Sequence, residues 1–363
     1  MPNFIHRDRF KLCMNHKESD KVPADLWIDS SDPTVKVSLM NYTAKNSYED
    51  LLDYLDIDIY RFKPAVSEKY KNAGGITRFF LPVTDVRMLS FSNDCVRRPL
   101  IDIEDPKDLD ALDWPTGEIF DYSNFDAILE FQKHRVLWAQ AGTWSPLFCK
   151  MCDLCGMEKV LVDLLTNPDL IEAMIQKILA FYEDSFRRTL EASRGHLDVF
   201  GFGDDFATQN GLMFNLKLWH QFLKEPMRRL VELIKSYDVY VAFHSCGAIG
   251  DIIPDFINMG VDILFPIQPR AAGMEAGRLK KDFGRDIVFY GGIDVQHILP
   301  FGAEKDVRDE VDRVSGILSK DGGYILASSH GILKDIPPAN VIAMYDEINS
   351  LGKAKHNQQS GQN

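Results

Sequence analysis

The chain has 363 residues, 45% of them hydrophobic, and a formal net charge of −13 at pH 7. This acidic balance excludes a nucleic-acid backbone as the main partner, because such binding depends on clustered Lys and Arg side chains. The N-terminus lacks the apolar core of a signal peptide, and no stretch approaches about 18 uninterrupted apolar residues. We therefore expect a cytoplasmic protein with a small-molecule or protein partner and no membrane segment.

The first part of the chain contains two strand candidates and then an irregular region. Short apolar runs at residues 22–28 and 57–62 indicate the two strands. Residues 66–135 follow, with a β-rich run at 76–81 and several prolines. We interpret residues 66–135 as a β-rich insertion folded over the mouth of a barrel. A hairpin that only caps the bottom of the barrel fits the same residues.

From about residue 130 onward, β-branched and aromatic runs alternate with helical patterns, which indicates repeated βα units. The strand candidates in this part are residues 136–140, 197–201, 239–243, 261–265, 287–290 and 324–327. Together with the two earlier candidates they predict a (β/α)8 TIM barrel, and the length of the chain suits that fold with an insertion. We assign residues 1–351 to a single barrel domain and residues 352–363 to a polar tail.

Apolar spacing predicts helices at residues 168–191 and 304–318. Asn167 is the expected N-cap of the first helix, with Pro168 at its first position. Residues 216–236 also follow a helical pattern, although Pro226 should kink this helix or split it in two.

Three of the six cysteines form the run Cys149, Cys152 and Cys155. The C-x2-C-x2-C spacing resembles the start of an iron–sulfur motif, but no fourth cysteine follows it. The same spacing places the three sulfur atoms along one face of a helix, where buried cysteines behave as small hydrophobic residues. We therefore favour a packing role for this run.

Candidate metal ligands follow two of the predicted strands. His244 and Cys246 come directly after the run 239–243, and His330 comes after the run 324–327. Because the carboxyl ends of barrel strands meet at one mouth, we expect these three side chains to lie together. Imidazole nitrogen and thiolate sulfur are ligands that Zn²⁺ prefers, and a catalytic site leaves its fourth position open. The sequence thus predicts a zinc site made of His244, Cys246 and His330.

Further polar side chains follow the same strand ends. Asp204 and Asp205 are our candidates for acid–base chemistry or for orienting a ligand histidine, and Asp294 could serve the same purpose. We expect Gln268, Gln209 and Ser329 to orient the substrate and Trp144 to shape its pocket. Simpler interpretations fit several of these residues. Asp204 or Asp205 could be a helix cap, His244 a satisfied core residue, and surface hydrogen bonding would explain Gln268, Gln209 and Ser329.

The order of several segments resembles the uroporphyrinogen decarboxylase superfamily, whose members are (β/α)8 barrels. The matching segments are Asp20-Lys-Val-Pro23, Arg98-Pro-Leu-Ile-Asp102, Asp113-Trp-Pro115, His244-Ser-Cys-Gly247, Phe289-Tyr-Gly-Gly-Ile-Asp294, Gly322-Gly-Tyr-Ile-Leu326 and Pro337-Pro-Ala-Asn340. Superfamily members occur as monomers and as dimers, so a homodimer is one expected state.

Within the superfamily, the chain looks like the corrinoid-dependent methyltransferases, including the methylcobamide:coenzyme M enzymes. That branch binds zinc through an H-x-C pair, matched here by His244 and Cys246, and through a later cysteine. His330 stands in place of that cysteine, and one thiolate with two neutral imidazoles would leave the zinc site with a formal charge of +1. The resemblance also favours Asp205 over Asp204 as the superfamily's aspartate in this loop.

This resemblance implies methyl transfer between a small substrate, of thiol, methyl ether or methylamine type, and a corrinoid. The chain has no D-x-H-x-x-G motif for corrinoid binding. We therefore expect the corrinoid to be a substrate or to be carried by a partner protein. The main alternative is a metal-free decarboxylase of the same superfamily, although residues 1–30 offer only Arg7 and Arg9 for a polycarboxylate substrate. A barrel that binds a corrinoid carrier without turnover is a third interpretation.

Overall fold

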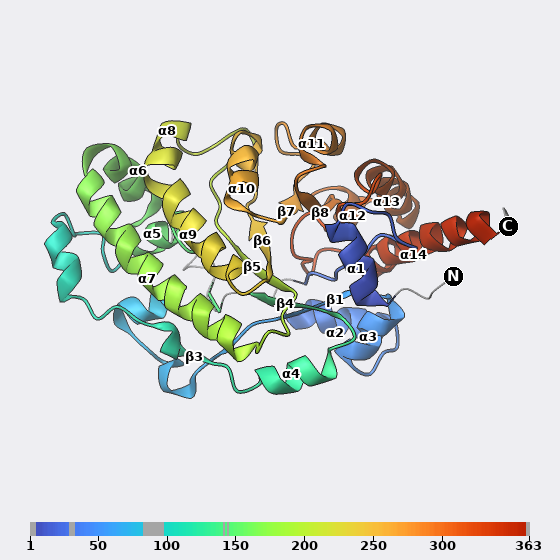
Figure 1. Cartoon of the computed structure of the whole chain (residues 1–363), viewed down its shortest axis with the longest axis horizontal. Helices are drawn as coiled ribbons and strands as arrows, with labels where there is room; N and C mark the ends of the chain where they lie inside the picture. Colours follow the sequence, from blue (N-terminus) through green and yellow to red (C-terminus); the bar gives the residue numbers. More distant parts are fainter. Residues whose placement is uncertain (1–4, 29–32, 83–97, 141, 144, 361–363) are drawn as a thin grey trace.

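The computed structural model describes residues 5–28, 33–82, 98–140, 142–143 and 145–360, with side chains described as far as Gly352. Its centre is a curled parallel sheet in the order β1-β4-β5-β6-β7-β8-β9 (Figure 1). The strands are β1 Ile59–Phe62, β4 Val136–Gln140, β5 Val199–Gly203, β6 Tyr240–His244, β7 Ile263–Ile267, β8 Val288–Ile293 and β9 Tyr324–Ser328. Seven of the eight predicted strands are therefore present.

The eighth predicted strand, residues 22–28, is present only as isolated bridges. Ala24 pairs with Leu326 of β9, and Ile28 pairs with Ile332. On its other side, the carbonyl of Ala24 accepts a hydrogen bond of 2.9 Å from the backbone N–H of Asp58, just before β1. This segment thus contacts both outer strands of the sheet.

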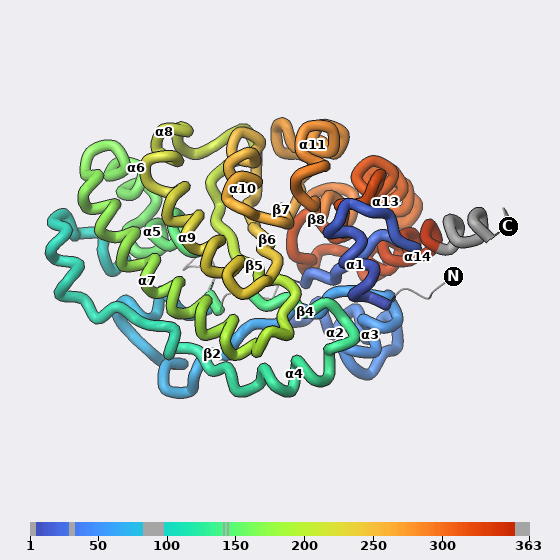
Figure 2. Tube along the Cα trace, in the orientation of Figure 1, coloured from blue at the N-terminus to red at the C-terminus, as the bar shows by residue number. Residues whose placement is uncertain are grey.

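In the described part of the chain, three helices precede β1, and from β4 onward helices alternate with the strands and lie outside the sheet (Figure 1). They are α1 His6–Met14, α2 Pro33–Tyr42, α3 Tyr48–Tyr54, α4 Phe125–Phe131, α5 Phe148–Cys155, α6 Met157–Thr166, α7 Pro168–Ala192, α8 Leu216–Leu218, α9 Lys224–Lys235, α10 Ile253–Met259, α11 Ala276–Phe283, α12 Ile298–Phe301, α13 Glu304–Leu318 and α14 Pro338–Ser360. The trace in Figure 2 shows the blue N-terminal part beside red α14, and α2 contacts that helix. No helix of the described part is long and apolar enough to cross a membrane.

The predicted helices are confirmed, with one local change. α7 and α13 cover the predicted ranges, while the third helix is divided into α8, a π-helical turn Trp219–Leu223 and α9. Pro226 lies in the first turn of α9 and has no N–H for a helical hydrogen bond, so the wider turn absorbs the interruption. The predicted polar tail is mostly helical, because α14 continues to Ser360.

The β-rich insertion predicted for residues 66–135 is not found in the described part of that region. The run 76–81 forms a 3-10 helix, Gly75–Phe80, and the only paired strands are the two-residue β2 Ala65–Val66 and β3 Phe120–Asp121. Residues 83–97 lie outside the described residues. Phe80 is fully buried with its ring 4.5 Å from that of Phe181, so these aromatic residues pack against α7 instead of pairing in a sheet.

The apolar residues of the sheet divide between two cores. One set points inward and includes Trp138, Phe265 and Tyr290, and Phe10 and Cys13 of α1 pack against it. The other set faces the surrounding helices. Cys149, Cys152 and Cys155 are all buried in this outer core on α5, which supports the packing interpretation of the cysteine run.

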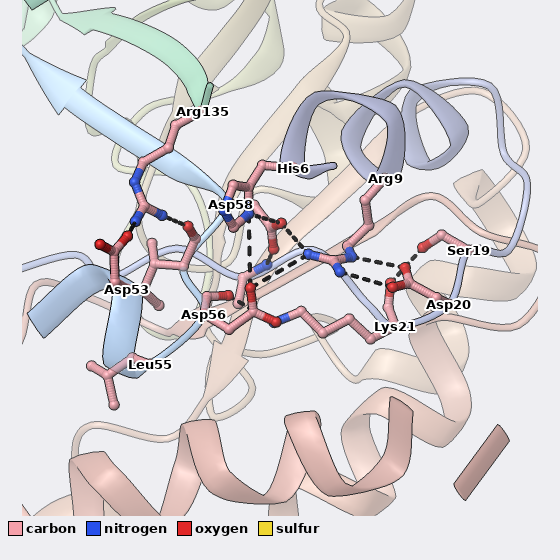
Figure 3. Close-up of polar contacts among 12 residues, drawn as sticks. His6, Arg9, Ser19, Asp20, Lys21, Asp53, Leu55, Asp56, Asp58 and Arg135 are labelled. Atoms are coloured by element: carbon pink, nitrogen blue, oxygen red, sulfur yellow. Dashed lines mark hydrogen bonds and ion pairs between the residues drawn. The ribbon is translucent and has the colours of Figure 1, made fainter. Parts of the chain in front are cut away.

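A network of buried ion pairs joins α1 to the chain before β1 (Figure 3). The Asp58 carboxylate is fully buried and accepts hydrogen bonds from His6 Nδ1 at 2.8 Å and from the backbone N–H of Ala24 at 2.9 Å. Arg9 bridges Asp58 and Asp20. Burial alone would raise the pKa of Asp58, but the hydrogen bond from His6 and the charges of Lys21 and Arg9 hold it below its ordinary value.

Candidate metal centre

Two neighbouring strands deliver the candidate ligands to one edge of the sheet. β5 ends at Gly203 and is followed by Asp205, while β6 ends at His244 and is followed by Cys246. Gly203 pairs in register with His244, and a Cβ atom at Gly203 would lie 2.2 Å from the carbonyl oxygen of His244. Only glycine therefore permits this close approach of the two strand ends.

Asp205, His244 and Cys246 place one ligand atom each within 4.8 Å of one another. Nε2 of His244 lies 3.3 Å from Sγ of Cys246 and 3.6 Å from Oδ1 of Asp205. Zinc bonds of about 2.0 to 2.3 Å at tetrahedral angles hold neighbouring ligand atoms about 3.3 to 3.8 Å apart. The residues present thus fit a zinc ion held by three protein ligands.

The surroundings of the three side chains favour metal binding. Burial lowers the pKa of His244 despite the nearby Asp205, so the imidazole is neutral, which is the form that binds a cation. Burial alone would raise the pKa of Asp205, but His244 and the backbone N–H of Cys246, which donates at 2.8 Å, hold it below its ordinary value. Burial and the Asp205 carboxylate raise the pKa of the Cys246 thiol well above its ordinary value. A bound cation would favour the thiolate.

His330, the third ligand predicted from the sequence, does not belong to the three-residue group found among the described side chains. It follows β9, and its ring centroid lies 5.3 Å from that of Trp27, whose other neighbours include the ring of His244 at 5.6 Å. His330 is therefore close to the centre, and its role as a ligand stays a prediction.

The structure gives Asp204 a clear local task. Its carboxylate is fully buried and accepts hydrogen bonds from the backbone N–H groups of Leu147 at 3.0 Å, Phe148 at 2.5 Å and Cys149 at 2.9 Å. It thus caps the N-terminus of α5, where a negative charge is stabilised by the helix dipole. Burial raises the pKa of Asp204 to about 7, against the lowering effect of the Cys149 and Phe148 N–H groups.

Asp294 is buried near the end of β8, and Arg270 is its ionic neighbour. Its Oδ1 accepts a hydrogen bond of 2.7 Å from the backbone N–H of Gln296, and its Oδ2 lies 3.6 Å from Nη1 of Arg270. These contacts hold the loops after β7 and β8 together. An acid–base role for Asp294 stays a prediction.

The predicted substrate-binding side chains connect the loops around the centre. Gln268 Oε1 accepts hydrogen bonds from the backbone N–H of Gly247 at 2.9 Å and from Nε2 of Gln209 at 3.3 Å. Ser329 Oγ accepts one of 3.2 Å from the backbone N–H of Val295. Trp144 lies outside the described residues. Contacts of these residues with a substrate stay predictions.

Two residues near the centre were not assigned these roles from the sequence. Asp205 was expected to support the ligands, whereas the structure places its carboxylate in the group of atoms that could hold a metal ion. Arg61 of β1 was not singled out, although its guanidinium stacks 4.0 Å from the ring centroid of Trp138 inside the sheet. The available signal for Arg61 was a charged residue within the otherwise uncharged strand Ile59–Phe62.

Taken together, these contacts define a parallel α/β protein with a candidate metal centre at the carboxyl edge of its sheet. Residues 98–351 match the family Uroporphyrinogen decarboxylase (URO-D), so the chain belongs to the uroporphyrinogen decarboxylase family. This confirms the superfamily resemblance seen in the sequence. No protein of curated function matches the sequence.

Solved structures are similar to this chain at low sequence identity. A methyltransferase from Methanosarcina mazei is similar with a TM-score of 0.65 and 17% identity, over 96% of this chain and 99% of that one. A mannanase from Bacillus subtilis has a TM-score of 0.46 and 10% identity, over 92% of this chain and 87% of that one. A D-psicose 3-epimerase from Clostridium cellulolyticum H10 has a TM-score of 0.42 and 9% identity, over 91% and 96%. The first similarity supports the curled parallel fold.

Proposed function

We propose that this protein is a zinc-dependent methyltransferase that moves a methyl group between a small substrate and a corrinoid. The observation that carries the proposal is the group of Asp205, His244 and Cys246, whose spacing fits a tetrahedral zinc ion. The resemblance of the H-x-C pair to zinc-binding methyltransferases supports the same reaction. Three protein ligands would leave a fourth position for the substrate.

The ligand set determines the charge of the centre. One thiolate from Cys246 and one carboxylate from Asp205 balance Zn²⁺, with His244 as a neutral third ligand. This differs from the +1 charge expected for His244, Cys246 and His330. When bound, zinc would supply Lewis acidity toward the thiol, oxygen or nitrogen atom that carries or receives the methyl group.

The surrounding residues would hold this centre in shape. The backbone N–H of Cys246 donates to Asp205, which couples the positions of two ligands on different strands. The rings of Trp27 and Phe265 lie 5.6 and 5.2 Å from that of His244 and limit its motion. Such support is what keeps a metal site preorganised and partly shielded from water.

The corrinoid would come from outside this chain, on a partner protein or as a free substrate. The sequence contains no corrinoid-binding D-x-H-x-x-G motif, which supports this division of labour. The direction of methyl transfer would depend on which molecule reaches the centre in its methylated form, the small substrate or the corrinoid.

Metal analysis tests the proposal most directly. Protein purified without added metal should contain about one zinc per chain, and a Cys246→Ser variant should retain much less. Addition of methylcobalamin and a thiol acceptor should then change the cobalamin absorption spectrum with wild-type protein. A folded chain that neither holds zinc nor demethylates methylcobalamin would contradict the proposal and favour the metal-free decarboxylase.

A further inference from the structure

Arg61 carries a buried positive charge inside the curled sheet, close to the candidate metal centre. It pairs in register with Trp138 of β4, and its side chain is only 11% exposed. The guanidinium carbon lies 4.0 Å from the ring centroid of Trp138, 5.1 Å from that of Tyr290 and 5.3 Å from that of Phe265. Arginine stacks well on aromatic faces because its planar cation is weakly hydrated.

Nε makes the hydrogen bond that anchors this guanidinium. Nε donates to Oδ2 of Asp25 at 2.5 Å, and the same oxygen accepts the hydroxyl of Tyr290 at 2.8 Å. Among the residues that the structure describes, neither Nη1 nor Nη2 of Arg61 has a hydrogen-bond partner, and both atoms are buried. Nε1 of Trp138, the ring beneath the guanidinium, also has none. Buried donors are rarely left in this state, so a missing acceptor is expected here.

The position of Arg61 connects it to the centre through shared neighbours. The ring of Phe265 contacts both the guanidinium, at 5.3 Å, and the His244 ring, at 5.2 Å. The indole of Trp27 also lies 5.6 Å from the guanidinium and 5.6 Å from the His244 ring. Each of these two rings therefore lies between the guanidinium and the imidazole of His244.

We propose that Arg61 binds an anionic group of the substrate, a carboxylate or a similar oxyanion, through Nη1 and Nη2. This inference rests on the proposed function, because the other end of the same molecule would lie at the metal centre. The parallel N–H groups of a guanidinium match the two oxygens of a carboxylate, which an uncharged amide cannot reproduce. The aromatic rings would enclose the short apolar stem of the substrate. Trp27, which is half-buried, covers the guanidinium and would move aside when the substrate enters.

The test compares 3-mercaptopropionate with 3-mercaptopropionamide, which differ only in the charged group. Titration calorimetry on the full chain, both zinc-loaded and metal-stripped, gives two dissociation constants in each form. We expect the acid to bind at least about tenfold more tightly than the amide, because only the acid forms the paired ionic contact. Equal affinities for acid and amide in the wild-type protein would overturn the inference.

Variants identify the residue responsible. Arg61→Gln should remove the preference for the acid, and Arg61→Lys should retain only part of it, because a lysine lacks the planar fork. Arg313→Gln is the matched control, since Arg313 is exposed on α13 and pairs with Glu310. A folded Arg61→Gln variant with the wild-type preference would also overturn the inference. If circular dichroism shows that neither Arg61 variant folds, the comparison of acid and amide in the wild-type protein decides.

The two proposals fail in different ways. A chain that holds zinc but binds acid and amide equally keeps its metal centre and loses the anion site. A chain without zinc whose preference for the acid depends on Arg61 has the anion site but not the proposed metal chemistry. Measuring zinc content alongside each titration separates these results.

Discussion

Replacing Asp205 with asparagine tests the proposed role of this residue as a metal ligand. In the proposed centre this carboxylate would supply one of three ligand atoms and one of two negative charges, and it lies 3.6 Å from Nε2 of His244. Asparagine keeps an oxygen that can accept the N–H of Cys246, now 2.8 Å away, so the loop should retain its shape. The variant therefore changes the ligand charge with little change of geometry.

The expected loss of zinc affinity exceeds that of a supporting residue. Removing a partner that only orients a ligand costs about 10- to 100-fold in metal affinity, so the loss of a charged ligand should cost at least about 100-fold. This corresponds to about 2.7 kcal/mol of binding free energy. Competition with a chromophoric chelator measures the dissociation constant directly. Asp309→Asn is the control, because Asp309 is exposed on α13 and pairs with Lys305.

A parallel measurement on His330→Gln distinguishes the two ligand sets. If Asp205 is the third ligand, Asp205→Asn loses more zinc affinity than His330→Gln. If Asp205→Asn binds zinc as tightly as wild type while His330→Gln does not, the ligand set built from Asp205, His244 and Cys246 is refuted. The set predicted from the sequence would then replace it.

Three further changes test other parts of the structure. Gly203→Ala should lower both zinc affinity and the urea midpoint of unfolding, because its Cβ would lie 2.2 Å from the His244 carbonyl oxygen; zinc binding and unfolding equal to wild type would contradict this close approach. Cys246→Ser should abolish the thiolate-to-cobalt absorption of the Co²⁺-substituted protein, and an unchanged spectrum would exclude Cys246 as a ligand. Asp58→Asn should destabilise the fold by about 3 to 5 kcal/mol near pH 7, since it breaks a buried ion pair. The folded pKa of Asp58 is lowered from 3.8, so its contribution is present above that value and lost as the pH falls through the folded pKa. The difference in urea midpoint between wild type and variant should stay constant above pH 3.8 and shrink below it, and a difference that does not shrink would show that Asp58 does not cause the acid dependence.

The sheet could be predicted because its strands are buried on both faces. Such strands appear in the sequence as short apolar runs, as in Val288–Ile293 and Tyr324–Ser328, and regular helical patterns separate them. The same reasoning gave a wrong prediction for the run 76–81, which was expected to be β-rich and forms a 3-10 helix. Its aromatic residues are buried against helices, and burial alone does not distinguish a strand from a 3-10 helix when the run is short.

The candidate centre could be predicted in part, for a reason visible at Asp204 and Asp205. Both residues follow β5, so the sequence places both near the mouth without assigning their tasks. The three N–H groups at the start of α5 bind Asp204, which leaves Asp205 to join His244 and Cys246. Residues 147–149 that make this choice lie more than 50 positions earlier in the chain, and only the fold brings them together.

The charges inside the sheet explain how a chain with a net charge of −13 could still select an acidic substrate. Asp205 and Cys246 would neutralise zinc, and Asp25 neutralises Arg61 through Nε. Neither the centre nor the arginine then offers a net positive charge that would attract anions from a distance. Selection would depend on short-range hydrogen bonds from Nη1 and Nη2 of Arg61, which remain unused among the described residues. Binding of the acid should therefore depend only weakly on ionic strength, since contacts of this kind are screened much less than surface charges.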